Sequence, residues 1–207
     1  MNNDFLIKEL RAVRVLKTPR IIEAFQKIDR ADFVRAEERA QAYANTPLPI
    51  GQKQTISQPF TVAFMLELLQ PCPGEKILDI GAGSGWQTAL LAEIVGETGK
   101  VFAIELLAEL FAFGKNNVSK YDFIKNGVVK FYCQNAQDGL FAEAPFDKII
   151  SAAASDAVPP AWKKQLKIGG RLILPVDGSL RLIVKKTEND FEEFIYPGFT
   201  FVPFINN

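Results

Sequence analysis

The chain has 207 residues, 48% of them hydrophobic, and its 24 lysines and arginines balance 24 aspartates and glutamates. This length suits one domain with a sizeable core, and zero net charge argues against broad electrostatic binding to nucleic acid or to a membrane. The sequence contains no histidine, which excludes a Ser-His-Asp triad, a Cys-His pair, histidine metal ligands and a histidine general base.

The first sixty residues predict helices followed by extended chain. Apolar residues recur at helical spacing from Phe5 to Leu16 and again from Ile21 to Ile28, with Pro19 in the first turn of the second helix. Residues 31–45 predict a loop that contains a short charged helix at 36–41. Prolines and polar residues over 45–59 indicate extended or looped chain, and a further helix is expected from Phe60 to Leu69.

The centre of the chain predicts a strand, a glycine turn and a helix. Residues 76–80 are short and apolar, Gly81, Gly83 and Gly85 alternate, and helical spacing follows from Gln87. Glycine lets the backbone turn sharply and lets a ligand approach closely. The dinucleotide fingerprint G-x-G-x-x-G would need a third glycine at the position of Trp86, so a diphosphate is not the expected ligand. A plain tight turn between strand and helix is the alternative.

A second apolar strand, residues 100–105, ends in Glu105, which lies 20 residues beyond Gly85. A carboxylate at this point of a βαβ unit can accept hydrogen bonds from ribose hydroxyls. The alternatives for Glu105 are a helix N-cap or a solvated strand end. The glycine turn and this acid together predict a nucleoside-type cofactor.

The remaining segments continue the alternation of helix and strand. Gly169-Gly170 is expected to end the last helix, and the predicted elements are a helix at 106–120, strands at 128–133 and 146–151, a helix at 159–166, strands at 171–175 and 180–186, and a final strand or pair within 193–204. This order predicts a single α/β domain with a doubly wound, mostly parallel, Rossmann-like sheet and an antiparallel strand near its C-terminus.

Cys72 and Cys133 lack C-x-x-C spacing, so neither a zinc site nor a disulfide framework is expected, and no metal ligand set is predicted. The N-terminal residues are charged and contain no apolar core of a signal peptide, and no stretch approaches transmembrane length. We expect a cytoplasmic monomer that binds neither nucleic acid nor a membrane.

Two runs together carry a resemblance to a known family. The first, before a helix, is Gln54-Thr55-Ile56-Ser57-Gln58-Pro59, and the second is Asp79-Ile80-Gly81-Ala82-Gly83-Ser84-Gly85. In these two runs the chain resembles the protein-L-isoaspartate O-methyltransferases. Further matches follow in the same order at 144–147, 166–176 and 201–203, so the likeness covers roughly residues 20–204. The resemblance implies a class I methyltransferase fold and S-adenosylmethionine as cofactor.

The resemblance also implies a reaction. A methyl group would pass from S-adenosylmethionine to the free α-carboxylate of L-isoaspartyl residues in damaged proteins and peptides, as the first step of their repair. A carboxylate is ionised at neutral pH and a sulfonium methyl is already activated, so the reaction needs no general base and suits a chain without histidine. The alternatives are a methyltransferase of this fold for another carboxylate, a non-catalytic isoaspartyl-binding module and, less favoured, an NAD-type dehydrogenase.

The resemblance assigns site residues as well. Ser57 is the expected catalytic residue, with a hydrogen-bonding role toward the acceptor carboxylate, because no base is present to make it a nucleophile; capping of the following helix is its alternative. Residues 1–60 are expected to form part of the active site. The expected cofactor-binding residues are Thr55, Ile56, Asp79, Gly81, Gly83, Gly85, Glu105, Asn135 and Ala136.

Asn135, Ala136 and Lys53 are among the positions that depart from the family pattern. Asn135-Ala136 stands where the family usually has an acid and a glycine after the third strand, and Lys53 stands where a glycine is usual. A neutral amide accepts a weaker hydrogen bond than a carboxylate does, so we expect the cofactor to bind more weakly here than in relatives. The alternative for Asn135 is that it only shapes a turn.

Overall fold

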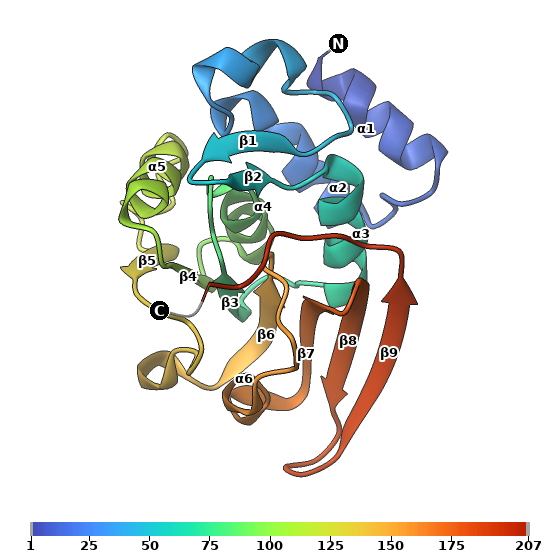
Figure 1. The fold of residues 1–207 in the computed structure, drawn as a ribbon, viewed down its shortest axis with the longest axis vertical. Coiled ribbons are helices and arrows are strands. Elements are labelled where there is room, and N and C mark those ends of the chain that lie inside the picture. Colours follow the sequence, from blue (N-terminus) through green and yellow to red (C-terminus); the bar gives the residue numbers. More distant parts are fainter. Residues whose placement is uncertain (1, 206–207) are drawn as a thin grey trace.

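A seven-stranded sheet forms the centre of the computed structural model, which describes residues 2–205 (Figure 1). Its strand order is β5-β4-β3-β6-β7-β8-β9, and the strands from β5 to β7 are parallel. The strands are β3 (Lys76–Ile80), β4 (Lys100–Glu105), β5 (Val129–Cys133), β6 (Phe146–Ser151), β7 (Leu166–Val176), β8 (Ser179–Lys185) and β9 (Phe191–Pro197). The predicted doubly wound, mostly parallel sheet is confirmed, and its order reverses between β3 and β6, where such folds bind ligands.

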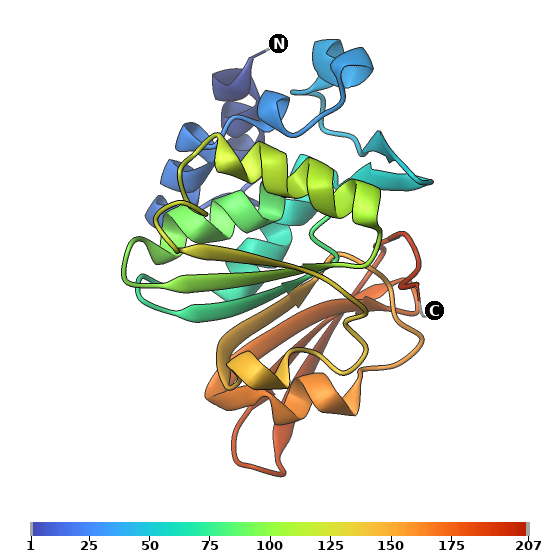
Figure 2. The same cartoon turned by 90° about the vertical axis from the view of Figure 1, so that its left-hand side faces the viewer.

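Helices cover both faces of this sheet, which explains why its central strands are continuous apolar runs. After their first residue, β3 and β4 are buried throughout. Figure 2 shows α4 (Trp86–Val95) and α5 (Ala108–Ser119) on one face, with η3 (Phe141–Glu143) and α6 (Pro160–Lys164) on the other. No helix within residues 2–205 is long and apolar enough to cross a membrane.

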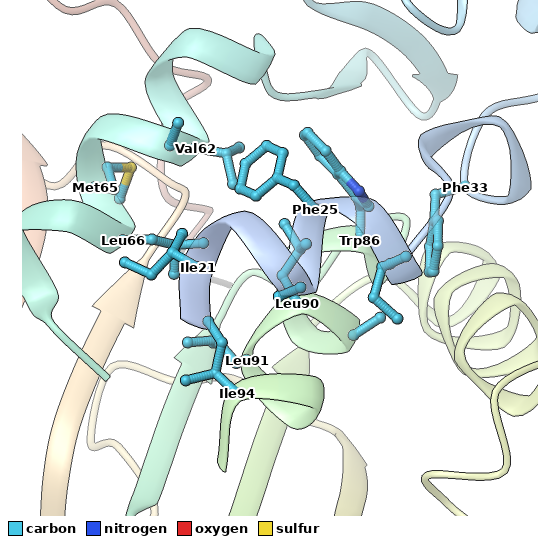
Figure 3. Packing of buried hydrophobic residues seen from close by; sticks show 14 of the residues in the cluster. Ile21, Phe25, Phe33, Val62, Met65, Leu66, Trp86, Leu90, Leu91 and Ile94 are labelled. Atoms are coloured by element: carbon cyan, nitrogen blue, oxygen red, sulfur yellow. The ribbon is translucent and has the colours of Figure 1, made fainter. Parts of the chain in front are cut away.

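The N-terminal elements pack over α4 and share its core. They are α1 (Asn3–Ala12), α2 (Pro19–Lys27), η1 (Arg30–Asp32), η2 (Ala36–Gln41), the antiparallel hairpin of β1 (Leu48–Gly51) and β2 (Gln54–Ile56), and α3 (Pro59–Leu69). Phe25 of α2 meets Trp86 of α4 edge to face, with ring centroids 5.6 Å apart, and Ile21 of α2 lies beside Leu66 of α3 (Figure 3). Leu48, Ile50 and Ile56 of the hairpin are buried in the same cluster, which anchors the hairpin to these helices.

One predicted boundary is wrong. The last helix ends at Lys164, and Gly169 and Gly170 lie inside β7 rather than after a helix. The β6–β7 pairing shifts register between Phe146 and Lys148, and the glycine pair lies opposite this irregularity. Gly169 takes φ +80°, and a Cβ on Gly170 would lie 2.9 Å from the Asp147 carbonyl oxygen. These glycines therefore accommodate an irregular start to a strand.

The predicted antiparallel strand near the C-terminus is β8, which runs antiparallel to both of its neighbours, β7 and β9. The predicted short helix at 36–41 forms as a 3-10 helix over the same residues.

Gly114 of α5 brings that helix against the glycine turn. A Cβ on Gly114 would lie 2.5 Å from the Gly83 carbonyl oxygen, and one on Gly85 would lie 2.8 Å from the Gly114 carbonyl oxygen. The neighbouring Asn117 donates from Nδ2 to the Ser84 carbonyl at 3.0 Å. The turn is thus held from behind by close helix packing that leaves no room for a methyl group.

We predict that Gly114→Ala lowers the free energy of unfolding by about 1–3 kcal/mol, because the added methyl overpacks the contact with Gly83. Urea denaturation measures this difference. Asn116→Ala, on the exposed side of the same helix, is the control and should stay within about 0.5 kcal/mol of the unaltered protein. Equal stability of the Gly114 variant would contradict the close packing.

Candidate functional site

A pocket of about 600 Å³ lies at the carboxyl ends of β3, β4 and β6. The glycine turn and Glu105 form one wall, Thr55 of the hairpin forms another, and the C-terminal segment 202–205 forms a third. Figure 1 shows the chain after β9 running back across the sheet beneath β1 and β2 before it reaches this segment. The chain thus brings three distant segments together at the switch point of the sheet.

A smaller pocket of about 330 Å³ adjoins it. Thr55, Gly81, Gly83 and Ala152 line both pockets, so the two are neighbours across the glycine turn. Ser57 and Ile56 line only the smaller one. The arrangement offers one compartment for a cofactor and an adjoining one for the group that reacts with it.

The backbone of the glycine turn has a conformation that favours glycine. Gly81, Gly83 and Gly85 have φ angles of +75°, +53° and +84°. A Cβ on Gly81 would lie 3.6 Å from the Ala153 side chain, and one on Gly83 would lie 3.2 Å from Ile50 Cδ1. Gly81 and Gly83 face the pocket and leave a cradle that side chains would fill, whereas Gly85 is buried against Gly114.

Glu105 lines the pocket and also holds the turn. Its Oε2 accepts from the Gly83 amide at 2.9 Å, and its Oε1 accepts from the Leu107 amide at 2.9 Å. Leu107, rather than Glu105, is the N-cap residue of α5, and only 7% of Glu105 is exposed, so the N-cap and solvated-end alternatives do not fit. An ionised carboxylate has about four acceptor positions, which leaves capacity for ribose hydroxyls.

Asp79 lies beneath the turn rather than in the pocket. It is fully buried, and its carboxylate accepts from Gln87 Nε2 at 2.7 Å and from Thr88 Oγ1 at 2.6 Å. Burial raises the pKa of Asp79 to about 6, against the lowering effect of these two hydrogen bonds, and the nearby Glu105 charge raises the pKa further. The geometry gives Asp79 the task of fastening β3 to the first turn of α4.

The residues that follow β5 do not all face the pocket. Ala136 lines the pocket together with its neighbour Gln134, whereas Asn135 is not among the described residues that line it. Asn135 Oδ1 accepts from the Gln137 amide at 2.7 Å. This bond is an Asx-type turn, as the turn-shaping alternative for Asn135 expects.

Ser57 is half-buried and lies two residues before α3. The N-cap position of α3 belongs to Gln58, so capping does not explain Ser57. Among the wall residues that the sequence did not assign to the site are Ile50, Gln54 and the C-terminal segment 202–205. Residues 201–203 match the family pattern in the sequence, but that match does not indicate that Val202 and Pro203 line the pocket.

The raised pKa of Asp79 has a consequence for stability. Its folded-state pKa, about 6, lies above the ordinary value of 3.8, so the folded protein holds a proton that the unfolded chain releases between these values. The stability that this proton confers is present at low pH and is lost as the pH rises through about 6.

We predict that the free energy of unfolding, relative to that of Asp79→Asn, falls by about 1–3 kcal/mol between about pH 4 and about pH 7. Parallel urea titrations of the two proteins at several pH values measure this difference. A difference that stays constant over the range would show that the pKa of Asp79 is not raised.

The comparisons with known proteins agree with this geometry. A family model described as "Protein-L-isoaspartate(D-aspartate) O-methyltransferase (PCMT)" matches residues 1–207. A protein-L-isoaspartate O-methyltransferase from Methanopyrus kandleri is 38% identical over 204 residues, covering 97% of this chain and 89% of that protein. One from Aeropyrum pernix is 41% identical over 185 residues, covering 88% and 70%.

A solved structure has the same fold. It is a Plasmodium falciparum protein assigned as a protein-L-isoaspartate O-methyltransferase and crystallised with S-adenosyl-L-homocysteine. It superposes with a TM-score of 0.90 at 22% identity, over 100% of both chains. From the family model and the relatives, the chain belongs to the protein-L-isoaspartate O-methyltransferase family.

Proposed function

We propose that the protein transfers a methyl group from S-adenosylmethionine to the free α-carboxylate of L-isoaspartyl residues in damaged proteins and peptides. The observation that carries this proposal is the pair of adjoining pockets, one bounded by the glycine turn and Glu105 and the other containing Ser57. Membership of the family supplies the substrate class.

The residues of the larger pocket fit this cofactor. The cradle at Gly81 and Gly83 would admit its amino-acid portion, Glu105 would accept hydrogen bonds from its ribose hydroxyls, and Thr55 and Ala136 would lie along its sides. When bound, the cofactor supplies a methyl group that is already activated on a sulfonium. Because it fixes the turn, the Glu105–Gly83 bond prepares this wall before any ligand arrives.

The protein's part in the reaction is positioning. An acceptor carboxylate is ionised at neutral pH, so no side chain has to remove a proton from it. The Ser57 hydroxyl would donate a hydrogen bond to one carboxylate oxygen and direct the other toward the methyl group. The C-terminal segment 202–205 and the β1–β2 hairpin would exclude water from the reacting atoms.

We also propose that residues 1–60 complete the active site within one chain and that the protein acts as a cytoplasmic monomer. Ile50, Gln54 and Thr55 all line the larger pocket, so no second copy is required to supply that wall. Cys72 and Cys133 are both free thiols, which suits a reducing compartment. Sedimentation analysis tests the monomer, and cell fractionation tests the compartment.

The deciding experiment compares two peptides that differ only in an L-isoaspartyl or a normal L-aspartyl residue. With methyl-labelled S-adenosylmethionine, we expect labelled ester on the isoaspartyl peptide alone. Transfer to both peptides would indicate a less selective carboxyl methyltransferase. Binding of the isoaspartyl peptide without transfer would indicate a non-catalytic module.

Glu105→Gln should weaken binding of S-adenosylmethionine about tenfold or more, because charged hydrogen bonds are worth roughly 1.5–3 kcal/mol each. Isothermal titration calorimetry measures the dissociation constant. Glu97→Gln, on the exposed turn after α4, is the matched control. Unchanged affinity in the Glu105 variant would remove the ribose role from this residue.

Ser57→Ala should lower kcat/KM for the isoaspartyl peptide by about tenfold to a hundredfold, the value of one hydrogen bond to a charged group. Affinity for the cofactor should change little, because Ser57 lines only the smaller pocket. Steady-state kinetics and calorimetry on the same preparation separate the two effects. An equal loss of cofactor affinity would place Ser57 on the donor side.

A further inference from the structure

Arg30, in η1, has no exposed surface, and its guanidinium binds one segment of main chain. Nη1 donates to the carbonyl oxygens of Ala42 and Ala44 at 2.8 and 3.1 Å. Nη2 donates to the carbonyl oxygens of Thr46 and Ser57 at 2.9 and 3.1 Å. Four carbonyls, spread over the loop that precedes β1 and the residue that follows β2, thus converge on one side chain.

The position is costly for a cation. Burial lowers the pKa of Arg30 to about 9, and no carboxylate forms an ion pair with it within residues 2–205. Its Nε has no hydrogen-bond partner among the described residues. Arginines are seldom fully buried unless they are paired, so a purely structural tie could be made at lower cost by apolar packing.

The guanidinium carbon of Arg30 lies over the Trp86 ring, 5.2 Å from the ring centroid. Trp86 is the first residue of α4, directly after the glycine turn, and it lines the smaller pocket together with Ser57. Figure 3 shows its ring beside Phe25, whose edge-to-face contact fixes the ring in place. Arg30 therefore joins the wall that carries Ser57 to the wall that follows the glycine turn.

We propose that Arg30 is a positioning residue for methyl transfer, which sets the place of Ser57 through the Ser57 carbonyl and relates it to the end of the glycine turn through Trp86. The expected effect of Arg30 on the rate of methyl transfer rests on the proposed function. A planar fork with two terminal nitrogens reaches two pairs of carbonyls while its central carbon lies over an indole, and the single ammonium nitrogen of lysine cannot make all of these contacts.

The experiment is a double-mutant cycle of Arg30→Lys and Ser57→Ala. Arg30→Lys should lower kcat/KM for the isoaspartyl peptide by about tenfold to a hundredfold, as misplacement of a positioning group does. In the Ser57→Ala background the same change should cost less than about threefold, since the group that it positions is already gone. The affinity for S-adenosylmethionine should stay within about twofold in each variant, and Arg39→Lys on exposed η2 is the control.

Amide hydrogen exchange gives a readout that does not depend on activity. Arg30→Lys should speed exchange in residues 42–57 and leave β3 and β4 unchanged. Three results would each overturn the proposal. They are equal losses of kcat/KM in both backgrounds, unaltered amide exchange over residues 42–57, and a loss of cofactor affinity that parallels the loss of kcat/KM.

Arg30→Gln, which keeps an amide donor, is the second variant. If neither variant folds, Arg30 is a structural requirement and the proposal fails. If the unaltered protein methylates no isoaspartyl peptide, the proposed function fails instead, and the exchange measurement still decides whether Arg30 holds the loop.

Discussion

The hydrogen bond from the Gly83 amide to the buried Glu105 carboxylate is the contact on which the site depends. It joins the turn after β3 to the end of β4, so two neighbouring strands present a fixed surface at the point where the sheet reverses its order. Asp79 fastens the same turn from below, and Gly114 and Asn117 hold it from behind. The pocket wall is therefore formed by the folded chain itself, and a ligand need not order it.

Most of the fold could be predicted because buried parallel strands and amphipathic helices leave local patterns. The apolar run ending in Glu105 and the glycines from Gly81 to Gly85 locate the central βαβ unit without knowledge of any contact. The Gly169-Gly170 pair could not be placed in the same way. Its role depends on the register of β7 against β6, and the same dipeptide is an equally good helix stop.

In the site, too, residues within local sequence motifs could be predicted, whereas residues that act through contacts distant in sequence could not. Sequence motifs predicted five residues that the structure brings to two adjoining pockets, namely Gly81, Gly83, Glu105, Thr55 and Ser57. Asn135 was expected in the cofactor site by resemblance, but its amide oxygen forms a turn with Gln137. Arg30 and Gly114 matter through residues distant in sequence, so neither carries a local pattern that would reveal its role.

Because the chain contains no histidine, its catalysis has to depend on positioning, and this requirement explains the buried charged residues that bind main chain. A methyl transfer to an ionised carboxylate needs no proton transfer, so its rate depends on how closely the acceptor oxygen, the methyl group and the sulfur are held in line. Such accuracy requires fixed main chain on both sides of the reacting atoms. Buried charged groups that bind backbone provide it at a cost in desolvation, as Glu105 does at Gly83 and Arg30 does at Ser57. Two of the buried charged residues, Glu105 and Arg30, thus bind main chain on either side of the proposed reaction site, at the glycine turn and at Ser57.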